Sequence, residues 1–216
     1  LARGGISERI VAFAEATLGR IRGGLSIVSV LASMFIAAIS GSGAATTAAV
    51  GSALLPELKA KKYDVDFSAA LIASAGTIGV VIPPSVPMVL YAVIAGESVA
   101  KLFMAGFIPG ALMGGGLIAY AIWVANKRGY PAGEKLPGAE VSRRFVSALW
   151  GLMTPVIILG GIFTGVFTPS EAAAIAVDYT LLVAWLVYRS LDFKKFYELV
   201  VNAGVTSALI MFIIAT

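Results

Sequence analysis

The residues best suited to bind a ligand are small hydroxyl residues and glycines in the middle of a long uncharged stretch. Between Arg22 and Glu57 the chain runs for 34 residues without a charged side chain, and residues 40–47 read Ser-Gly-Ser-Gly-Ala-Ala-Thr-Thr. Hydroxyl and carbonyl oxygens are neutral ligands that suit an alkali cation where a helix is broken. Close helix packing is the alternative explanation for small residues. The expected ion ligands here are Ser40, Gly41, Ser42 and Thr46.

A second interruption follows at residues 76–85, which read Gly-Thr-Ile-Gly-Val-Val-Ile-Pro-Pro-Ser. Proline removes a backbone donor and disfavours helix in the residue before it, so we expect the helix to unwind here and a half-helix to restart. Freed carbonyls can bind a cation, whereas a half-helix N-terminus favours a substrate carboxylate. The expected cation ligands are Thr77, Ile78 and Gly79. The expected substrate contacts are Pro83, Pro84 and Ser85, with a simple kink as the alternative.

Several kinds of chemistry are disfavoured by what the sequence lacks. It contains no His and no Cys, which removes imidazole and thiolate chemistry. Neither break contains a carboxylate, which disfavours Ca²⁺, Mg²⁺ and a proton relay and favours Na⁺ as the coupling ion. An intramembrane serine protease needs a base beside its nucleophile, and Ser42 has no His or Lys at its depth. No Walker A motif occurs. We therefore expect no enzyme and no cofactor, with Na⁺ as the coupling ion.

The elements that position these residues are expected to be membrane helices. The chain is 59% hydrophobic and 13% charged, with a mean hydropathy of +0.93, whereas soluble domains are about 25% charged. None of the apolar runs alternates as a membrane barrel strand does. The predicted fold class is an all-α integral membrane protein. Nearly uncharged runs long enough to span a bilayer or form a hairpin lie at 23–56, 67–96, 102–126, 145–170, 172–188 and 199–216.

The positions of the basic residues predict the topology. Cytoplasmic loops carry an excess of Lys and Arg, and fifteen of the sixteen lie at 3–22, 59–62, 127–144 and 189–195. Both flanks of the first run are therefore cytoplasmic, which favours a re-entrant hairpin over a kinked single span. The expected hairpin has a helix at 24–39, a tip at 40–47 and a helix at 48–60. Each arm of about 15 residues covers roughly 23 Å, which places the tip deep in the membrane.

Four segments resemble the large membrane (permease) subunit of tripartite ATP-independent periplasmic (TRAP) transporters, and the resemblance covers essentially the whole chain in the right order. They are Gly4-Gly5-Ile6-Ser7-Glu8-Arg9, the tip 40–43, the segment 77–85, and residues 160–174, Gly-Gly-Ile-Phe-Thr-Gly-Val-Phe-Thr-Pro-Ser-Glu-Ala-Ala-Ala. The resemblance implies an inverted-repeat, elevator-type transporter with a re-entrant hairpin and a broken helix. It also implies Na⁺-coupled uptake of a small organic acid, such as a C4-dicarboxylate or sialic acid.

The implied partners are a small membrane subunit, a periplasmic binding protein that delivers the substrate, and the lipid bilayer, with no nucleic acid. The implied location is the bacterial or archaeal cytoplasmic (inner) membrane, with several crossings. A stand-alone Na⁺/dicarboxylate symporter of related fold is the main alternative function, and an intramembrane enzyme is a remote one. Many relatives have an Asp at the position of Thr46, so the first ion site here is expected to be uncharged.

The resemblance implies that the chain is an internal fragment of a longer protein. Its first segment is an amphipathic arm helix along the membrane interface, with Ile6, Ile10, Phe13 and Leu18 broadly on one face. The expected segments are this interfacial arm at 1–23, a re-entrant hairpin opening to the cytoplasm at 24–61, the broken and following transmembrane helices of the transport core at 62–128, a cytoplasmic loop at 129–144, and the start of a truncated second inverted repeat at 145–216.

Overall fold

The computed structural model describes residues 6–133 and 136–215, so Gly4 and Gly5 of the first resembling segment lie outside the described residues. Apart from an isolated bridge between Arg22 and Ala132, the described chain is helical or irregular. The all-α fold class is confirmed. The elements are α1 (Ile6–Leu18), α2 (Gly24–Ser40), α3 (Gly43–Ala60), α4 (Val65–Gly76), the 3₁₀ turn η2 (Thr77–Val80), α5 (Val86–Ala95), α6 (Val99–Arg128), α7 (Gly138–Phe163), α8 (Pro169–Leu182), the π turn η3 (Val183–Val187) and α9 (Phe193–Ala215).

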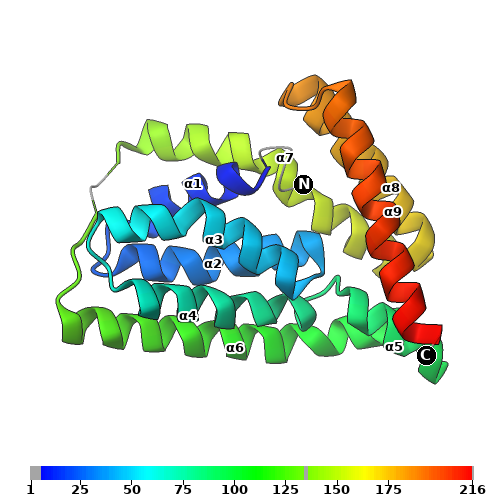
Figure 1. Cartoon of the computed structure of the whole chain (residues 1–216), viewed down its shortest axis with the longest axis horizontal. Coiled ribbons are helices and arrows are strands. Elements are labelled where there is room, and N and C mark those ends of the chain that lie inside the picture. The colour runs from blue at the N-terminus through cyan, green and yellow to red at the C-terminus, as the bar shows by residue number, and fades with distance from the viewer. Residues whose placement is uncertain (1–5, 134–135, 216) are drawn as a thin grey trace.

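Helices long and apolar enough to cross a membrane make up the second half of the described chain. By length and composition these are Val99–Arg128, Gly138–Phe163, Pro169–Val187 and Phe193–Phe212. α7 begins at Gly138, so residues 138–144, which the sequence placed in a loop, are helical. Figure 1 shows α8 and α9 standing at a steep angle to the roughly aligned helices α1 to α4 and α6.

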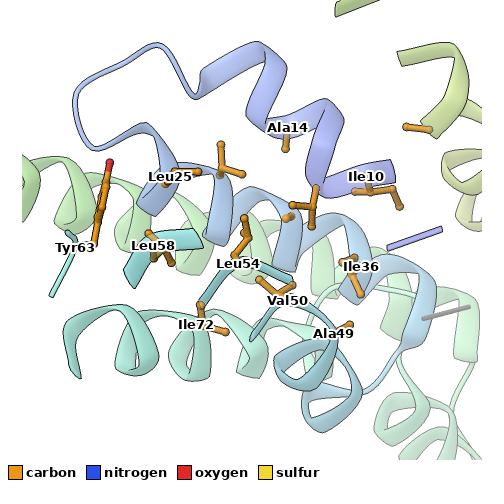
Figure 2. Close-up of a cluster of buried hydrophobic side chains, with 14 of the residues drawn as sticks. Ile10, Ala14, Leu25, Ile36, Ala49, Val50, Leu54, Leu58, Tyr63 and Ile72 are labelled. Atoms are coloured by element: carbon orange, nitrogen blue, oxygen red, sulfur yellow. The ribbon is translucent and has the colours of Figure 1, made fainter. Parts of the chain in front are cut away.

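The core lies where α1 and the α2–α3 hairpin meet α4. Ile10 from α1, Val28 from α2 and Leu54 from α3 are fully buried within it. Figure 2 shows Ile10 and Ala14 entering from one side of the hairpin and Ile72 from the other. Part of the expected apolar face of α1 therefore packs on protein, since Ile6 and Ile10 are buried and Phe13 and Leu18 are partly buried. This packing fixes the hairpin between α1 and α4.

The hairpin and the broken helix place their interruptions at the same end of this layer (Figure 1). α2 and α3 are separated by Gly41 and Ser42 alone, a tip much tighter than the eight residues expected. α4 ends at Gly76, and the chain passes through η2 and an irregular stretch before α5 begins at Val86. The proline-rich segment thus interrupts the helix as the sequence predicts.

A row of glycines on α6 brings that helix close to the break. A Cβ atom on Gly106 would lie 2.5 Å from the Val81 carbonyl oxygen, and one on Gly110 would lie 2.4 Å from the Ile82 side chain. Gly114 continues the row against Met34 of α2. The i, i+4 spacing puts these three glycines on one face of the helix. The unwound segment is therefore held between α6 and the hairpin.

The opposite end of the hairpin carries an ion-pair cluster. Lys61 lies 2.9 Å from Glu57 and 3.5 Å from Glu15 of α1, while Arg144 of α7 lies 3.4 Å from Glu15 and 3.0 Å from Glu140. Burial, together with a hydrogen bond to Glu57, raises the pKa of the Glu15 carboxyl above its ordinary 4.5, although Lys61 and Arg144 act in the other direction. The desolvation of Glu15 outweighs its ion pairs.

Glu15→Gln is therefore expected to be at least as stable as the wild type at pH 8. Because the folded chain holds the Glu15 proton more tightly than the unfolded chain, wild-type stability falls as the pH rises above about 4.5. Gln does not titrate. The melting temperature of the variant minus that of the wild type should therefore increase from pH 4.5 to pH 8. Glu57→Gln, which removes the partner 2.9 Å from Lys61, is the destabilising comparison. If the melting temperature of Glu15→Gln fell further below that of the wild type toward pH 8, the ion pairs of Glu15 would outweigh its desolvation.

Candidate functional site

Three hydroxyl residues form a closed network at the hairpin tip. The Ser40 and Thr46 hydroxyl oxygens lie 2.9 Å apart, the Ser40 hydroxyl oxygen lies 3.2 Å from the Ser42 carbonyl oxygen, and the Ser42 N–H donates to the Ser40 hydroxyl at 3.3 Å. A consistent arrangement has Thr46 donating to Ser40 and Ser40 donating to the Ser42 carbonyl. The Thr46 oxygen then keeps lone pairs for another partner. Thr46 is fully buried, although Ser40 is only partly so.

The remaining tip groups complete the helix ends. Gly41 adopts a left-handed conformation, with φ of 61°, and ends α2 by donating its N–H to the Ala37 carbonyl. The Ser42 hydroxyl accepts the Ala45 N–H at 3.4 Å, which is the N-cap of α3. The Ser42 side chain thus has a structural role in starting the second arm.

The broken helix approaches the tip through two glycines. A Cβ atom on Gly79 would lie 3.1 Å from both the Ser42 carbonyl and the Thr46 hydroxyl oxygen. On Gly76 it would lie within bonding distance of the Thr47 hydroxyl oxygen. Backbone of the break can therefore contact the tip only because side chains are absent there. Ser40, Ser42, Thr46 and Gly79 come together as one site.

Two expected ion ligands are oriented differently from the rest. The Thr77 hydroxyl is exposed and donates to the Ser74 carbonyl at 2.7 Å on its own helix. The Ile78 carbonyl already accepts the N–H groups of Val81 and Ile82, at 2.9 and 2.8 Å, and the residue is buried. Each lone pair of that oxygen has a partner, so Ile78 supports the turn in this conformation. Gly79 is the residue of the three that lies against the tip hydroxyls.

The start of α5 is joined directly to the hairpin tip. The Val86 N–H donates to the Gly41 carbonyl at 3.1 Å, and Pro87 has no N–H, which leaves Met88 as the donor that the first turn can still offer. The buried Ser85 hydroxyl donates to the Val80 carbonyl at 2.6 Å and does not cap the helix. The expected half-helix N-terminus is present, with fewer free N–H groups than an ordinary one.

A cavity of about 260 Å³, here called the tip cavity, lies between the hairpin tip, the start of α5 and the helices α7 and α8. Its wall combines a few hydroxyl groups with apolar side chains, and no charged residue is among the described residues that line it. Lining residues include Ser40, Gly41, Pro84, Ser85, Phe103, Thr154 and Thr180. The expected substrate contacts Pro84 and Ser85 therefore border a cavity, whereas Pro83 is buried.

Thr154 of α7 and Thr180 of α8 were not expected at this site from the sequence. For Thr154 the local signal is a hydroxyl residue followed by Pro155 within an apolar span. This pattern does not predict which helix packs opposite it.

Asp178, the ionisable residue of α8, is exposed and borders a different cavity between α8 and the start of α9. The described residues contain no cluster of three or more His, Cys, Asp or Glu side chains suited to a metal ion.

Comparison with known proteins places the whole chain in one group. The family described as "Tripartite ATP-independent periplasmic transporter, DctM component" matches residues 1–216. The chain is 46% identical to the isethionate TRAP transporter permease protein DctMQ of Oleidesulfovibrio alaskensis over 96% of its length and 33% of the relative. It is 44% identical to the C4-dicarboxylate TRAP transporter large permease protein DctM of Pseudomonas aeruginosa, over 98% of this chain and 50% of the relative.

A third relative is the 2,3-diketo-L-gulonate TRAP transporter large permease protein YiaN of Escherichia coli, 42% identical over 99% of this chain and 50% of the relative. The chain thus spans between a third and a half of the length of these curated relatives. All three are named as transporter permeases, which indicates a transporter rather than an enzyme. Their names differ in substrate, so similarity alone does not select one.

Proposed function

The chain belongs to the DctM component family of tripartite ATP-independent periplasmic transporters, and from this premise we propose that it is part of a permease that takes up a small organic acid together with Na⁺. The observation that carries the proposal is the tip network, in which the buried Thr46 hydroxyl faces Gly79 of the broken helix. Uptake is expected to occur by an elevator movement of the hairpin and the broken helix.

Neutral oxygens at the tip support Na⁺ as the coupling ion. Thr46 would provide its hydroxyl oxygen, and Ser40 and the backbone around Gly79 would complete this half of the site. A buried site without a carboxylate binds a monovalent cation more readily than a divalent one, because each further charge raises the desolvation cost. The ion would bridge the hairpin and the break, so its binding would favour the conformation in which they are in contact.

The tip cavity supports a small anionic substrate. Its volume of about 260 Å³ is just below the range of about 300–1,000 Å³ typical of ligand pockets, which suits a compact organic acid such as a C4-dicarboxylate or isethionate. The positive end of α5 borders this cavity. A carboxylate or sulfonate entering an uncharged wall requires a counter-charge, which Na⁺ at the neighbouring tip would supply.

The proposed setting is a multi-pass permease in the bacterial or archaeal cytoplasmic membrane. A small membrane subunit would complete it, and a periplasmic binding protein would deliver the substrate. The four candidate spans and the names of the relatives support this setting. Na⁺ dependence, the elevator movement and the identity of the substrate all belong to the proposal.

Reconstitution of the full-length complex in liposomes tests the proposal. Uptake of radiolabelled succinate, isethionate and N-acetylneuraminate is measured with an inward Na⁺ gradient, with K⁺ replacing Na⁺, and with the binding protein omitted. We expect one of these acids to accumulate only with both Na⁺ and the binding protein. Equal uptake in K⁺ would overturn the coupling, and uptake without the binding protein would favour a stand-alone symporter.

A further inference from the structure

Thr154 carries a buried hydroxyl that has no hydrogen-bond partner. The residue is 2% exposed, and its hydroxyl oxygen and that of Ser26 are the buried side-chain polar atoms of the described chain without a partner. Burying an unpaired hydroxyl destabilises a fold. A buried polar group of this kind needs a physical explanation, and a ligand that pairs with it provides one.

The neighbouring helix takes one acceptor that Thr154 would otherwise use. A helical threonine usually donates to the carbonyl four residues earlier, here that of Trp150. That carbonyl accepts the Tyr179 hydroxyl of α8 at 2.8 Å. Elsewhere in the described chain, threonine hydroxyls donate to a carbonyl three or four residues back at Thr17, Thr47, Thr77, Thr164, Thr180 and Thr206.

The position of Thr154 adds a second, independent observation. Thr154 lies in the wall of the tip cavity, together with Ser40 of the tip and Val86 at the start of α5. Rotation about the Cα–Cβ bond moves the threonine hydroxyl from one staggered position to another, and a helical threonine populates two of these positions. The hydroxyl can therefore turn toward a ligand in the cavity without movement of the backbone.

We propose that Thr154 binds the acidic group of the substrate by donating its hydroxyl in the tip cavity, beside the N-terminus of α5. This inference rests on the proposed function and adds a substrate contact from α7, outside the hairpin and the broken helix. A carboxylate or sulfonate accepts such a bond readily because a charged acceptor strengthens it. The contact forms only while α7 faces the tip, so Thr154 marks one stage of transport.

The test is Thr154→Val, which keeps the shape and removes the hydroxyl. In reconstituted full-length complex, uptake of whichever of succinate, isethionate and N-acetylneuraminate the wild type carries is expected to fall about 10-fold at saturating binding protein. Thermal stability in detergent is expected to stay equal or rise, because an unpaired buried hydroxyl is removed. Thr154→Ser, which retains the hydroxyl, should keep most of the uptake.

Two matched controls distinguish ligand binding from a structural effect. Thr206→Val removes a hydroxyl that donates to its own helix at Asn202 and does not line the cavity, and Ser26→Ala removes the other unpaired hydroxyl, which does not line the cavity either. Both should transport as the wild type does. Wild-type uptake by Thr154→Val would overturn this inference alone, and Na⁺-independent uptake by the wild type would overturn the coupling that it rests on.

Discussion

Gly41→Ala is expected to separate the hairpin tip from α5 and to reduce Na⁺-dependent uptake at least 10-fold. A Cβ atom at this position would lie 2.9 Å from the Pro84 carbonyl oxygen and 3.2 Å from the Val86 nitrogen, both of them backbone atoms. The left-handed φ of 61° adds strain for any residue with a Cβ. Moving the tip to relieve the clash breaks the hydrogen bond from Val86 to the Gly41 carbonyl.

The expected loss of stability for Gly41→Ala is about 2–4 kcal/mol, from the left-handed conformation and the lost hydrogen bond together. Gly96→Ala is the matched control, because Gly96 has a φ of 69° and a Cβ atom there would meet no neighbouring atom within 4 Å, so that variant bears the conformational cost alone. Thermal melts and uptake by both variants separate the two effects. Equal behaviour of the two variants would mean that the contact between tip and α5 is unimportant.

The breaks in the helices were predictable from local chemistry, whereas their extent was not. Glycine at 41 and consecutive prolines at 83 and 84 favour a break in a helix, although single prolines are accommodated inside α3, α6 and α7. The sequence nevertheless suggested a tip of eight residues, because small and hydroxyl residues are weak helix formers. In the structure, the Ser42 N-cap starts α3 at Gly43, and the buried Thr46 hydroxyl pairs with Ser40. The N-cap and this hydroxyl pair therefore extended the helix through residues of low propensity.

The contacts between helices distant in the chain could not be predicted from a single sequence. The hydroxyl chemistry of Ser40 and Thr46 could be read locally, since the two residues flank the same short tip. The environment of the unpaired Thr154 hydroxyl depends instead on Tyr179 of α8, which donates to the Trp150 carbonyl. Nothing in the local pattern predicts that pairing. The same limit applies to the Thr77 hydroxyl, whose bond to Ser74 depends on the exact course of the helix end.

Thr46→Val is expected to raise the Na⁺ concentration for half-maximal uptake about 10- to 100-fold. An oxygen that contacts a charged group contributes about 1.5–3 kcal/mol, which corresponds to that range. The fold should tolerate the change because valine has a similar shape and the Ser40 hydroxyl keeps the Ser42 carbonyl as an acceptor and the Ser42 N–H as a donor. Uptake at saturating Na⁺ should therefore recover toward the wild-type rate.

Thr47→Val makes the same chemical change one residue further along α3. The Thr47 hydroxyl donates to the Gly43 carbonyl of its own helix at 3.0 Å, so its loss should leave the Na⁺ dependence unchanged. The pair of variants separates ion binding from helix stability, because both replace a hydroxyl by a methyl group in the same turn. An unchanged Na⁺ dependence in Thr46→Val would mean that the tip hydroxyls only close the hairpin. A shift confined to Thr46→Val would assign this half of the ion site to the oxygen that faces Gly79.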